Sequence, residues 1–331
     1  MDTPNLTTSR YPRPIRFVAG AGAVRDPAAL IRAARRAEEM GYSALAMADH
    51  FMLPFAPLIA LQAVAGVTAA LRLAQTVLDQ DFRHPAVLAK ELATLDVLSG
   101  GRLEVGLGAG WMRSEYDQAG MRFDPAPVRI ERLEEVAIVL KGLFGPEPLS
   151  FSGKYFSIRE LNGTPKPAQH PRPPIMIGGG GPKLLAVAAR QADIIQVTPR
   201  IRPQSGPPDV REFTAGSYAR KLEWIGDAAG DRFADIELGV QLLNLTITDD
   251  VDRALGDLMA QFPSTERRTG RELDSLKEEI LSSPVVAIGS LDQVCDKLMA
   301  VRDSFGFSYF ACPVHARPAT LAPVIERLAG R

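Results

Sequence analysis

The 331-residue sequence has little of what would place it in a specialised class of protein. Its only two cysteines, Cys295 and Cys312, lie apart without metal-type spacing, so a disulfide scaffold is excluded. No apolar run approaches the roughly 18 residues of a membrane span, and the first residues have no signal-peptide core. A formal net charge of -1 gives no electrostatic reason to expect nucleic acid or an anionic membrane as partner. We therefore expect a cytoplasmic protein that acts on small molecules.

The histidines are also few, and none of them suggests a metal site. A metal site needs three or four convergent ligands, and the four histidines and two cysteines lack such spacing. We therefore expect no metal. His84 precedes a proline at a predicted helix start, which indicates a structural role, and His170 and His315 lie in connections.

Strand-like and helix-like segments alternate along most of the chain. Eight segments have the composition of strands: 15–20, 44–48, 71–78, 102–107, 174–177, 193–197, 236–248 and 307–313. Predicted helices separate most of them, namely 27–40, 57–70, Pro85 to the pair Gly100–Gly101, 129–144 and one that begins at Pro182. Eight such units predict a single (β/α)8 TIM barrel domain over 1–331, with an open doubly wound sheet as the alternative.

Three segments interrupt this alternation. The segment 149–158 alternates around Ser152-Gly153 and predicts an inserted β-hairpin. The segments 201–216 and 261–283 are rich in turn-forming or charged residues. Long connections in compact domains are commonly functional lids or disordered segments, so we regard these two as candidate lids.

Polar, glycine and aromatic residues gather where three predicted strands end. Asp49 and His50 follow the second strand, Asp79 follows the third, and Gly110 and Trp111 follow the fourth. The carboxyl ends of parallel strands form the face on which α/β folds build active sites. We therefore expect these side chains to lie together at the mouth of the barrel.

Two of these side chains suggest particular chemistry. Histidine exchanges protons readily near neutral pH, so we predict that His50 is catalytic or contacts a ligand. The plain alternative is a histidine that only hydrogen-bonds a loop. Trp111 follows a glycine loop, which suits stacking on a planar ligand, although a buried core indole is the alternative.

Two glycine-rich segments could approach a phosphate. The loop 178–181 joins a strand to a helix, where free backbone N–H groups and the helix dipole favour an anion. It is not a P-loop, because the GK[ST] ending is missing. The segment 106–110 resembles a dinucleotide fingerprint only superficially, since Trp111 replaces its third glycine and the segment falls in the fourth unit.

Taken as an ordered set, these segments resemble the bacterial luciferase-like flavin and deazaflavin oxidoreductases. The matching pieces run from Arg16 to about Pro313: RAARRAEEMGY, ALAMADH, FRHPAVLAKELATLDVLSGGRLEVGLGAGW, RIERLEEVAIVLKGLF, FSGKYF and PRPPIMIGGGGPKLLAVAARQADII. The phrase LDVLSGGRLEVGLGAGW is typical of the branch that uses coenzyme F420, a deazaflavin that transfers hydrides without activating oxygen.

The resemblance implies a (β/α)8 barrel and roles for particular residues. A bulge with a non-prolyl cis peptide against the cofactor ring would fall at Thr76-Val77, with Asp79 beside the ring edge. His50, preceded by Asp49, would lie next to the reactive face, and Gly110 and Trp111 would help to form the cofactor pocket. The cofactor phosphate would bind to the loop residues Gly179, Gly180 and Gly181 and to Thr198.

The sequence also departs from part of that family. The sugar-phosphate dehydrogenases of the F420 branch carry a catalytic glutamate where this chain has Trp111, and their basic residues for a substrate phosphate are not evident in 201–216. Glucose 6-phosphate is therefore a poor candidate substrate.

These observations predict an F420-dependent oxidoreductase that transfers a hydride between the reduced deazaflavin and an unsaturated small molecule. The alternatives are a monooxygenase that uses reduced FMN and oxygen, and a non-catalytic flavin-binding or accessory subunit on the same barrel. The expected partners are a second copy of the chain, in a homodimer, and a separate cofactor reductase.

Overall fold

Eight parallel strands close into a barrel in the computed structural model, which describes residues 13–21, 24–200, 209–262, 270–313 and 318–331. In barrel order these strands are β1 (Arg16–Gly20), β2 (Ala44–Met47), β3 (Arg72–Gln75), β5 (Leu103–Gly108), β8 (Ile175–Gly179), β9 (Ile194–Val197), β10 (Glu237–Gln241) and β13 (Phe307–Ala311). Pairing of β13 with β1 closes the ring. The predicted (β/α)8 barrel is confirmed, and the open sheet is excluded.

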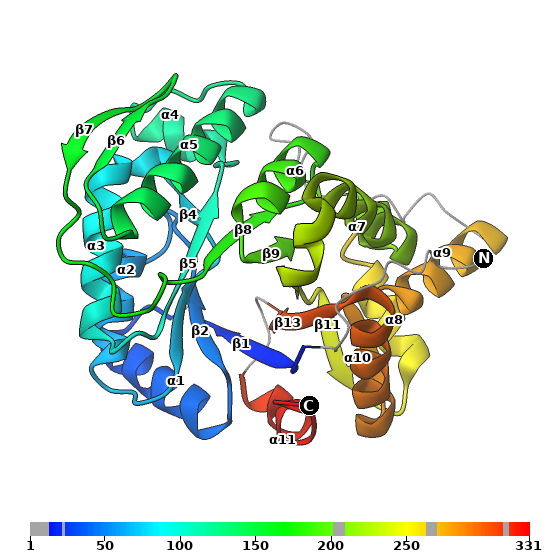
Figure 1. Ribbon diagram of the computed structural model, residues 1–331. Coiled ribbons are helices and arrows are strands. Elements are labelled where there is room, and N and C mark those ends of the chain that lie inside the picture. The colour runs from blue at the N-terminus through cyan, green and yellow to red at the C-terminus, as the bar shows by residue number, and fades with distance from the viewer. Residues whose placement is uncertain (1–12, 22–23, 201–208, 263–269, 314–317) are drawn as a thin grey trace.

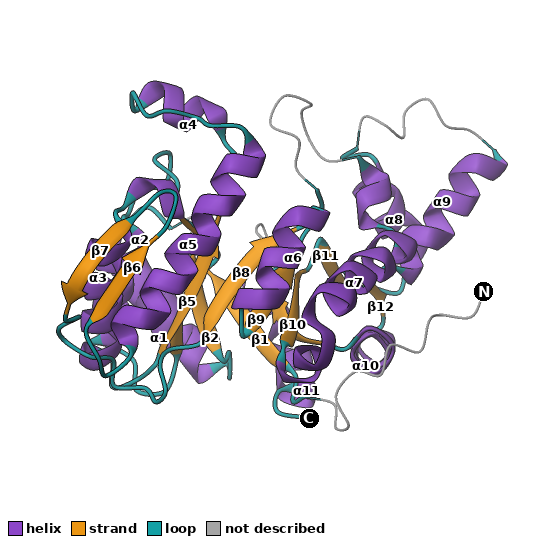
Figure 2. Cartoon of the chain, turned by 45° about the horizontal axis from the view of Figure 1, so that its top comes forward, coloured by secondary structure: helices purple, strands orange, loops and turns teal. Residues whose placement is uncertain are grey.

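Helices surround the strands, as Figures 1 and 2 show. They are α1 (Pro27–Glu39), α2 (Pro57–Ala65), α3 (Pro85–Leu98), α4 (Arg113–Gln118), α5 (Ala126–Phe144), α6 (Pro182–Gln191), α7 (Ala215–Ala229), α8 (Val251–Met259), α9 (Arg271–Ser282), α10 (Leu291–Phe305) and α11 (Ala322–Leu328). Within the described parts of the chain, no helix is both long and apolar enough to cross a bilayer.

Local sequence accounts for the ends of these helices. Asp26 accepts hydrogen bonds from the first-turn N–H groups of α1, and Ser290 forms a capping box with Gln293 on α10. His84 caps α3 by accepting from the N–H of Ala86 at 3.2 Å, which confirms its structural role. After α3 the chain turns through Gly100 and Gly101, both with positive φ.

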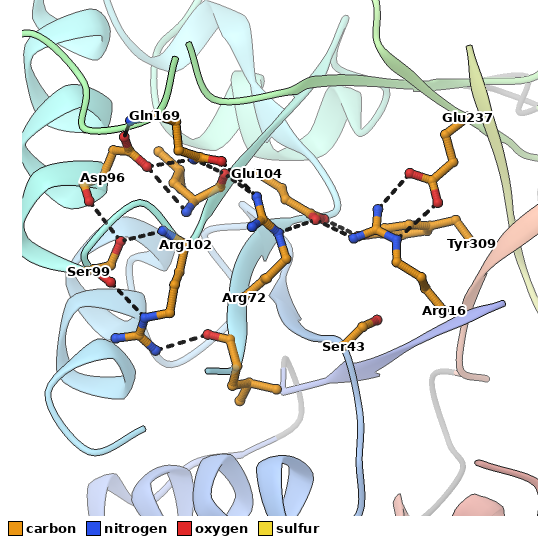
Figure 3. Close-up of polar contacts among 12 residues, drawn as sticks. Arg16, Ser43, Arg72, Asp96, Ser99, Arg102, Glu104, Gln169, Glu237 and Tyr309 are labelled. Carbon is orange, nitrogen blue, oxygen red and sulfur yellow. Dashed lines mark hydrogen bonds and ion pairs between the residues drawn. The ribbon is translucent and has the colours of Figure 1, made fainter. Parts of the chain in front are cut away.

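The barrel interior is layered, with a polar floor at the amino ends of the strands. Glu104, whose side chain is 1 % exposed, accepts hydrogen bonds from Arg16 and Arg72 at 2.6 Å and from Tyr309 at 2.9 Å. Figure 3 shows the carboxylate lying between the two guanidinium groups, with Glu237 on the far side of Arg16. Tyr309 also belongs to a buried cluster with the apolar residues Val18, Ala44, Ala46, Ala74, Met176, Ile194 and Ala311. The polar floor is therefore held together by charge-assisted hydrogen bonds among its own side chains.

Three predicted elements differ from those observed. The segment 236–248 is two strands, because the chain leaves the barrel after β10 and continues as β11 (Asn244–Ile247), which pairs with β12 (Val286–Gly289). The strand predicted at 71–78 is interrupted after β3 and resumes as β4 (Leu78–Asp79). The helix predicted at 57–70 ends at Ala65, and Gly66 follows it.

The predicted hairpin is present, whereas the candidate lids are largely helical where they are described. Strands β6 (Leu149–Ser152) and β7 (Ser157–Leu161) pack outside the barrel against α5, where Glu135 accepts the backbone N–H groups of the turn. Residues 201–208 and 263–269 lie outside the described residues. The remainder of the two segments includes the 3-10 turn Val210–Phe213, the start of α7, and α9.

Candidate active site

The strand-end residues form a continuous arc around the barrel mouth. Asp49, which follows β2, accepts two hydrogen bonds from the guanidinium of Arg83, at 2.5 and 3.3 Å. The same carboxylate accepts the backbone N–H of Asp79 at 3.3 Å, which ties the end of β2 to β4. Such a paired carboxylate organises neighbouring loops while its charge remains balanced.

His50 lies between a carboxylate and an indole. Its Nδ1 is 2.8 Å from Oε2 of Glu115, a residue of α4 whose side chain is 7 % exposed. Its ring meets that of Trp111 edge to face, with centroids 5.7 Å apart. Trp111 is 41 % exposed, so the alternative of a buried core indole is wrong.

The next residue of α4, Tyr116, contacts the carboxyl groups of Asp79 and Asp81. The buried Tyr116 hydroxyl lies 2.8 and 2.6 Å from the two carboxylate oxygens of Asp79 and 3.0 Å from Oδ2 of Asp81. Nε of Arg132 lies 2.7 Å from the other oxygen of Asp81. A tyrosine hydroxyl has one hydrogen to donate, so its close approach to two carboxyl groups favours a proton on one of them.

Burial makes this cluster hold its proton more firmly than exposed carboxyl groups do. Burial raises the pKa of Asp79 to about 6, against the hydrogen bond from Tyr116 that favours the charged form. Burial also raises the pKa of Asp81, although the charge of Arg132 opposes it. The pKa of the Tyr116 hydroxyl is raised by burial and by the two neighbouring carboxylates. The cluster can therefore retain a proton in mildly acidic solution.

Two glycines of β5 are required by close packing against β3 and the residues that follow it. The Thr76–Val77 peptide bond is cis, as the family resemblance implied. A Cβ atom at Gly106 would lie 1.8 Å from the carbonyl oxygen of Gln75, and one at Gly108 would lie 2.4 Å from Cγ2 of Val77. The spacing that superficially resembles a dinucleotide fingerprint therefore follows from contact between strands.

Gly110 completes this packing at the mouth. It has a φ of +71°, and a Cβ atom there would lie 2.1 Å from the Tyr116 hydroxyl oxygen and 2.6 Å from Oδ2 of Asp79. Only glycine fits this position, because both the conformation and the space exclude a side chain. Gly110 therefore lets α4 bring Tyr116 onto Asp79.

The glycine loop and Thr198 lie side by side at the ends of β8 and β9. The N–H of Thr198 donates to the carbonyl of Gly179 at 3.0 Å, and a Cβ atom at Gly180 would lie 2.2 Å from the carbonyl oxygen of Thr198. Gly181 is the N-cap of α6 and has no side-chain cap, and a Cβ atom there would meet nothing within 4 Å. Open space therefore faces a helix start whose first N–H groups lack intrahelical acceptors.

The structure brings the sequence-predicted site residues to one end of the barrel. Val77 lies between the two halves of the arc. Its side chain fills the space that a Cβ atom would need at Gly108 on one side and at Gly178 on the other. Sequence reasoning missed the side chains that organise this arc, which are Arg83, Asp81, Arg132, Glu115 and Tyr116. For Asp81 and Arg83 the available signal was their position shortly after β4, whereas Glu115 and Tyr116 lie in α4 and Arg132 lies in α5. The partners of these side chains come from other elements and could not be predicted from the sequence.

A family model described as a luciferase-like monooxygenase matches residues 13–308, which includes every element of the arc. The chain belongs to the luciferase-like monooxygenase family.

Relatives that use different cofactors align with different lengths of this luciferase-like chain. An F420-dependent glucose-6-phosphate dehydrogenase of Microbacterium testaceum is 32 % identical over 170 residues, covering 47 % of this chain and 48 % of the relative. An FMNH2-dependent dimethylsulfone monooxygenase of Pseudomonas putida is 35 % identical over 109 residues, covering 33 % of this chain and 30 % of the relative.

The chain thus spans about half the length, or less, of these curated relatives. Among solved structures, the coenzyme F420-dependent tetrahydromethanopterin reductase of Methanopyrus kandleri superposes with a TM-score of 0.72 at 18 % identity, covering 96 % of this chain and 98 % of that one. This likeness shows a shared fold. Family membership and fold are therefore established, whereas the cofactor and the substrate are matters for proposal.

Proposed function

We propose that this luciferase-like protein is an F420-dependent oxidoreductase that transfers a hydride between the reduced deazaflavin and an unsaturated small molecule. The observation that carries the proposal is the arrangement of the arc, in which a helix start without a side-chain cap and a histidine paired with a carboxylate lie at the same end of one barrel. Both are needed by an enzyme that binds a phosphate-bearing redox cofactor and moves one proton for each hydride.

The described residues fit such a cofactor. The space in front of Gly181 and the free N–H groups at the start of α6 suit its phosphate, with Thr198 alongside. Thr76, Val77 and Gly110 would flank the ring, and Trp111 would wall the pocket beside it. When bound, the reduced deazaflavin would supply the hydride.

The protein's own part is positioning and proton exchange. We assign to His50 the transfer of the proton that accompanies the hydride, since imidazole is the side chain best suited to this near neutral pH. Asp49 would hold the loop that carries His50, through its hydrogen bonds with Arg83 and with the N–H of Asp79. Asp79 would lie beside the ring edge, with its carboxylate held by Tyr116.

The choice of F420 over FMN rests on the extent of the similarity. The F420-dependent relatives from Microbacterium testaceum and Amycolatopsis mediterranei align with 47 % and 50 % of this chain, whereas the FMNH2-dependent relative aligns with 33 %. A monooxygenase that uses reduced FMN and oxygen, supplied by a separate reductase, is the second candidate because that shorter match has the higher identity.

Direct titration separates these candidates. Purified protein should bind F420 at least tenfold more tightly than FMN, a difference of about 1.4 kcal/mol, when each is titrated by fluorescence or calorimetry. Turnover with reduced F420 should be the same with and without oxygen. Equal or tighter FMN binding together with oxygen-dependent turnover would replace the proposal with the monooxygenase, and failure to bind either cofactor would favour a non-catalytic role.

A further inference from the structure

The carboxylate of Glu115 is held more firmly than a surface side chain would be. One of its oxygens lies 2.8 Å from Nδ1 of His50, and the other accepts the backbone N–H of Met52 at 3.5 Å. Its side chain is 7 % exposed. Glu115 therefore contacts both the ring of His50 and the loop that follows it, so the carboxylate and the imidazole are fixed relative to each other.

The contact also determines which ring nitrogen carries the hydrogen. A carboxylate can only accept hydrogen bonds, so the nitrogen that faces it must be protonated. Nδ1 of neutral His50 is therefore the N–H nitrogen, and Nε2 carries the lone pair. Among the described residues, no protein group forms a hydrogen bond with Nε2. The nitrogen able to take up a proton is therefore the one left available to a ligand.

We propose that Glu115 is a positioning residue that fixes the orientation and tautomer of His50 and stabilises the positive charge that the imidazole acquires when Nε2 takes a proton. The same logic governs carboxylate–histidine pairs in hydrolases, where the carboxylate orients the ring and stays ionised. The inference rests on the proposed function for its kinetic consequence, but the tautomer itself is a property of the protein without cofactor.

The placement of α4 supports a dedicated role for this pair. Adjacent residues of this six-residue helix reach two different strand ends, Glu115 to His50 after β2 and Tyr116 to Asp79 at the end of β4. Tyr116 is fully buried and packs against Phe82 and Phe123, so the helix is anchored independently of Glu115. Removing the Glu115 carboxylate should therefore leave α4 in place.

The first test measures the tautomer without any cofactor. Nitrogen-15 NMR of histidine-labelled protein, with the His50 signals assigned by their loss in His50→Ala, should show protonated Nδ1 and bare Nε2 in the wild type. Glu115→Ala should shift His50 toward the Nε2–H form. Asp117→Ala, on the same helix but in an exposed pair with Arg113, is the matched control and should leave the signals unchanged. An unchanged His50 tautomer in Glu115→Ala would overturn the proposal.

The second test is kinetic. With the active cofactor, Glu115→Ala should lower kcat by roughly 10–100-fold, the range found when a partner that orients a functional histidine is removed. The KM for the cofactor should change much less. The double variant with His50→Ala should be no slower than His50→Ala alone, because Glu115 acts through His50. Additive losses would overturn the inference; absence of turnover with every cofactor would refute only the proposed function, since the tautomer result stands by itself.

Discussion

At the scale of single residues, Asp79 is a buried side chain whose charge state changes in mildly acidic solution. The residue is 9 % exposed, and burial raises the pKa of its carboxyl group from 3.8 to about 6. Because the folded state holds the proton more tightly than the unfolded state, protonated Asp79 stabilises the fold fully below pH 3.8. That contribution is lost as the pH rises through about 6.

The variant Asp79→Asn tests this linkage. Asparagine stays neutral while its side-chain oxygen can still accept the Tyr116 hydroxyl, so the variant should lose less stability than the wild type between pH 4 and pH 7. The difference between the two proteins should change by up to roughly 3 kcal/mol over this range. Urea unfolding at several pH values measures it. Parallel pH dependence in both proteins would show that Asp79 titrates normally.

Elements differ in how far their sequences determine them. The strands and the helices α1, α3 and α6 could be predicted because buried apolar runs, capping residues and prolines at first turns are local signals. The exit of the chain from the barrel after β10 could not be predicted in this way. It depends on the pairing of β11 with β12, about 40 residues further along the chain. For the same reason the position of His50 after a strand could be predicted, whereas its contact with Glu115 could not.

The start of α6 offers a test in which stability and binding move in opposite directions. A side chain at Gly180 would collide with the Thr198 backbone, so substitution there would disturb the fold, but Gly181 has open space and a φ of -98° that any residue adopts. Aspartate or asparagine at Gly181 would cap α6 and add a few tenths of a kcal/mol of stability. Gly181→Asp should nevertheless weaken cofactor binding at least tenfold, because its charge repels the phosphate.

Asparagine is the matched control for that charge. Gly181→Asn has nearly the same shape and capping ability, so it should retain cofactor affinity better than Gly181→Asp. Thermal unfolding and cofactor titration of both variants provide the two measurements. Equal affinities for the aspartate and asparagine variants would place the phosphate somewhere other than the start of α6.

At the scale of the whole molecule, the two ends of the barrel use charged residues differently. At the mouth, burial raises the pKa values of Asp79 and Asp81, and the carboxylate of Glu115 contacts the ring of His50. At the floor, Glu104 joins Arg16, Arg72 and Tyr309 from three other strands, so its charge is compensated on several sides (Figure 3). Although burial opposes ionisation, the two guanidinium groups hold the pKa of Glu104 below its ordinary value. The floor therefore holds a charge that its neighbours compensate, whereas the mouth holds carboxyl groups that bind protons more tightly than exposed ones do.

Replacing Glu104 should separate these two properties. Glu104→Gln removes a buried charge while the arginines remain, which typically costs about 3–5 kcal/mol of unfolding free energy. Because the folded pKa of Glu104 lies below 4.5, its contribution is present above that pH and is lost as the pH falls through the lower folded value, so wild type and variant should converge in acid. The control Glu237→Gln, which leaves Arg16 paired with Glu104, should cost less unfolding free energy.

The folded Glu104→Gln protein should bind cofactor with wild-type affinity, because the floor lies at the opposite ends of the strands. Urea unfolding across pH with parallel cofactor titrations checks both expectations, and a variant of full stability but weakened binding would show that the floor and the mouth are coupled.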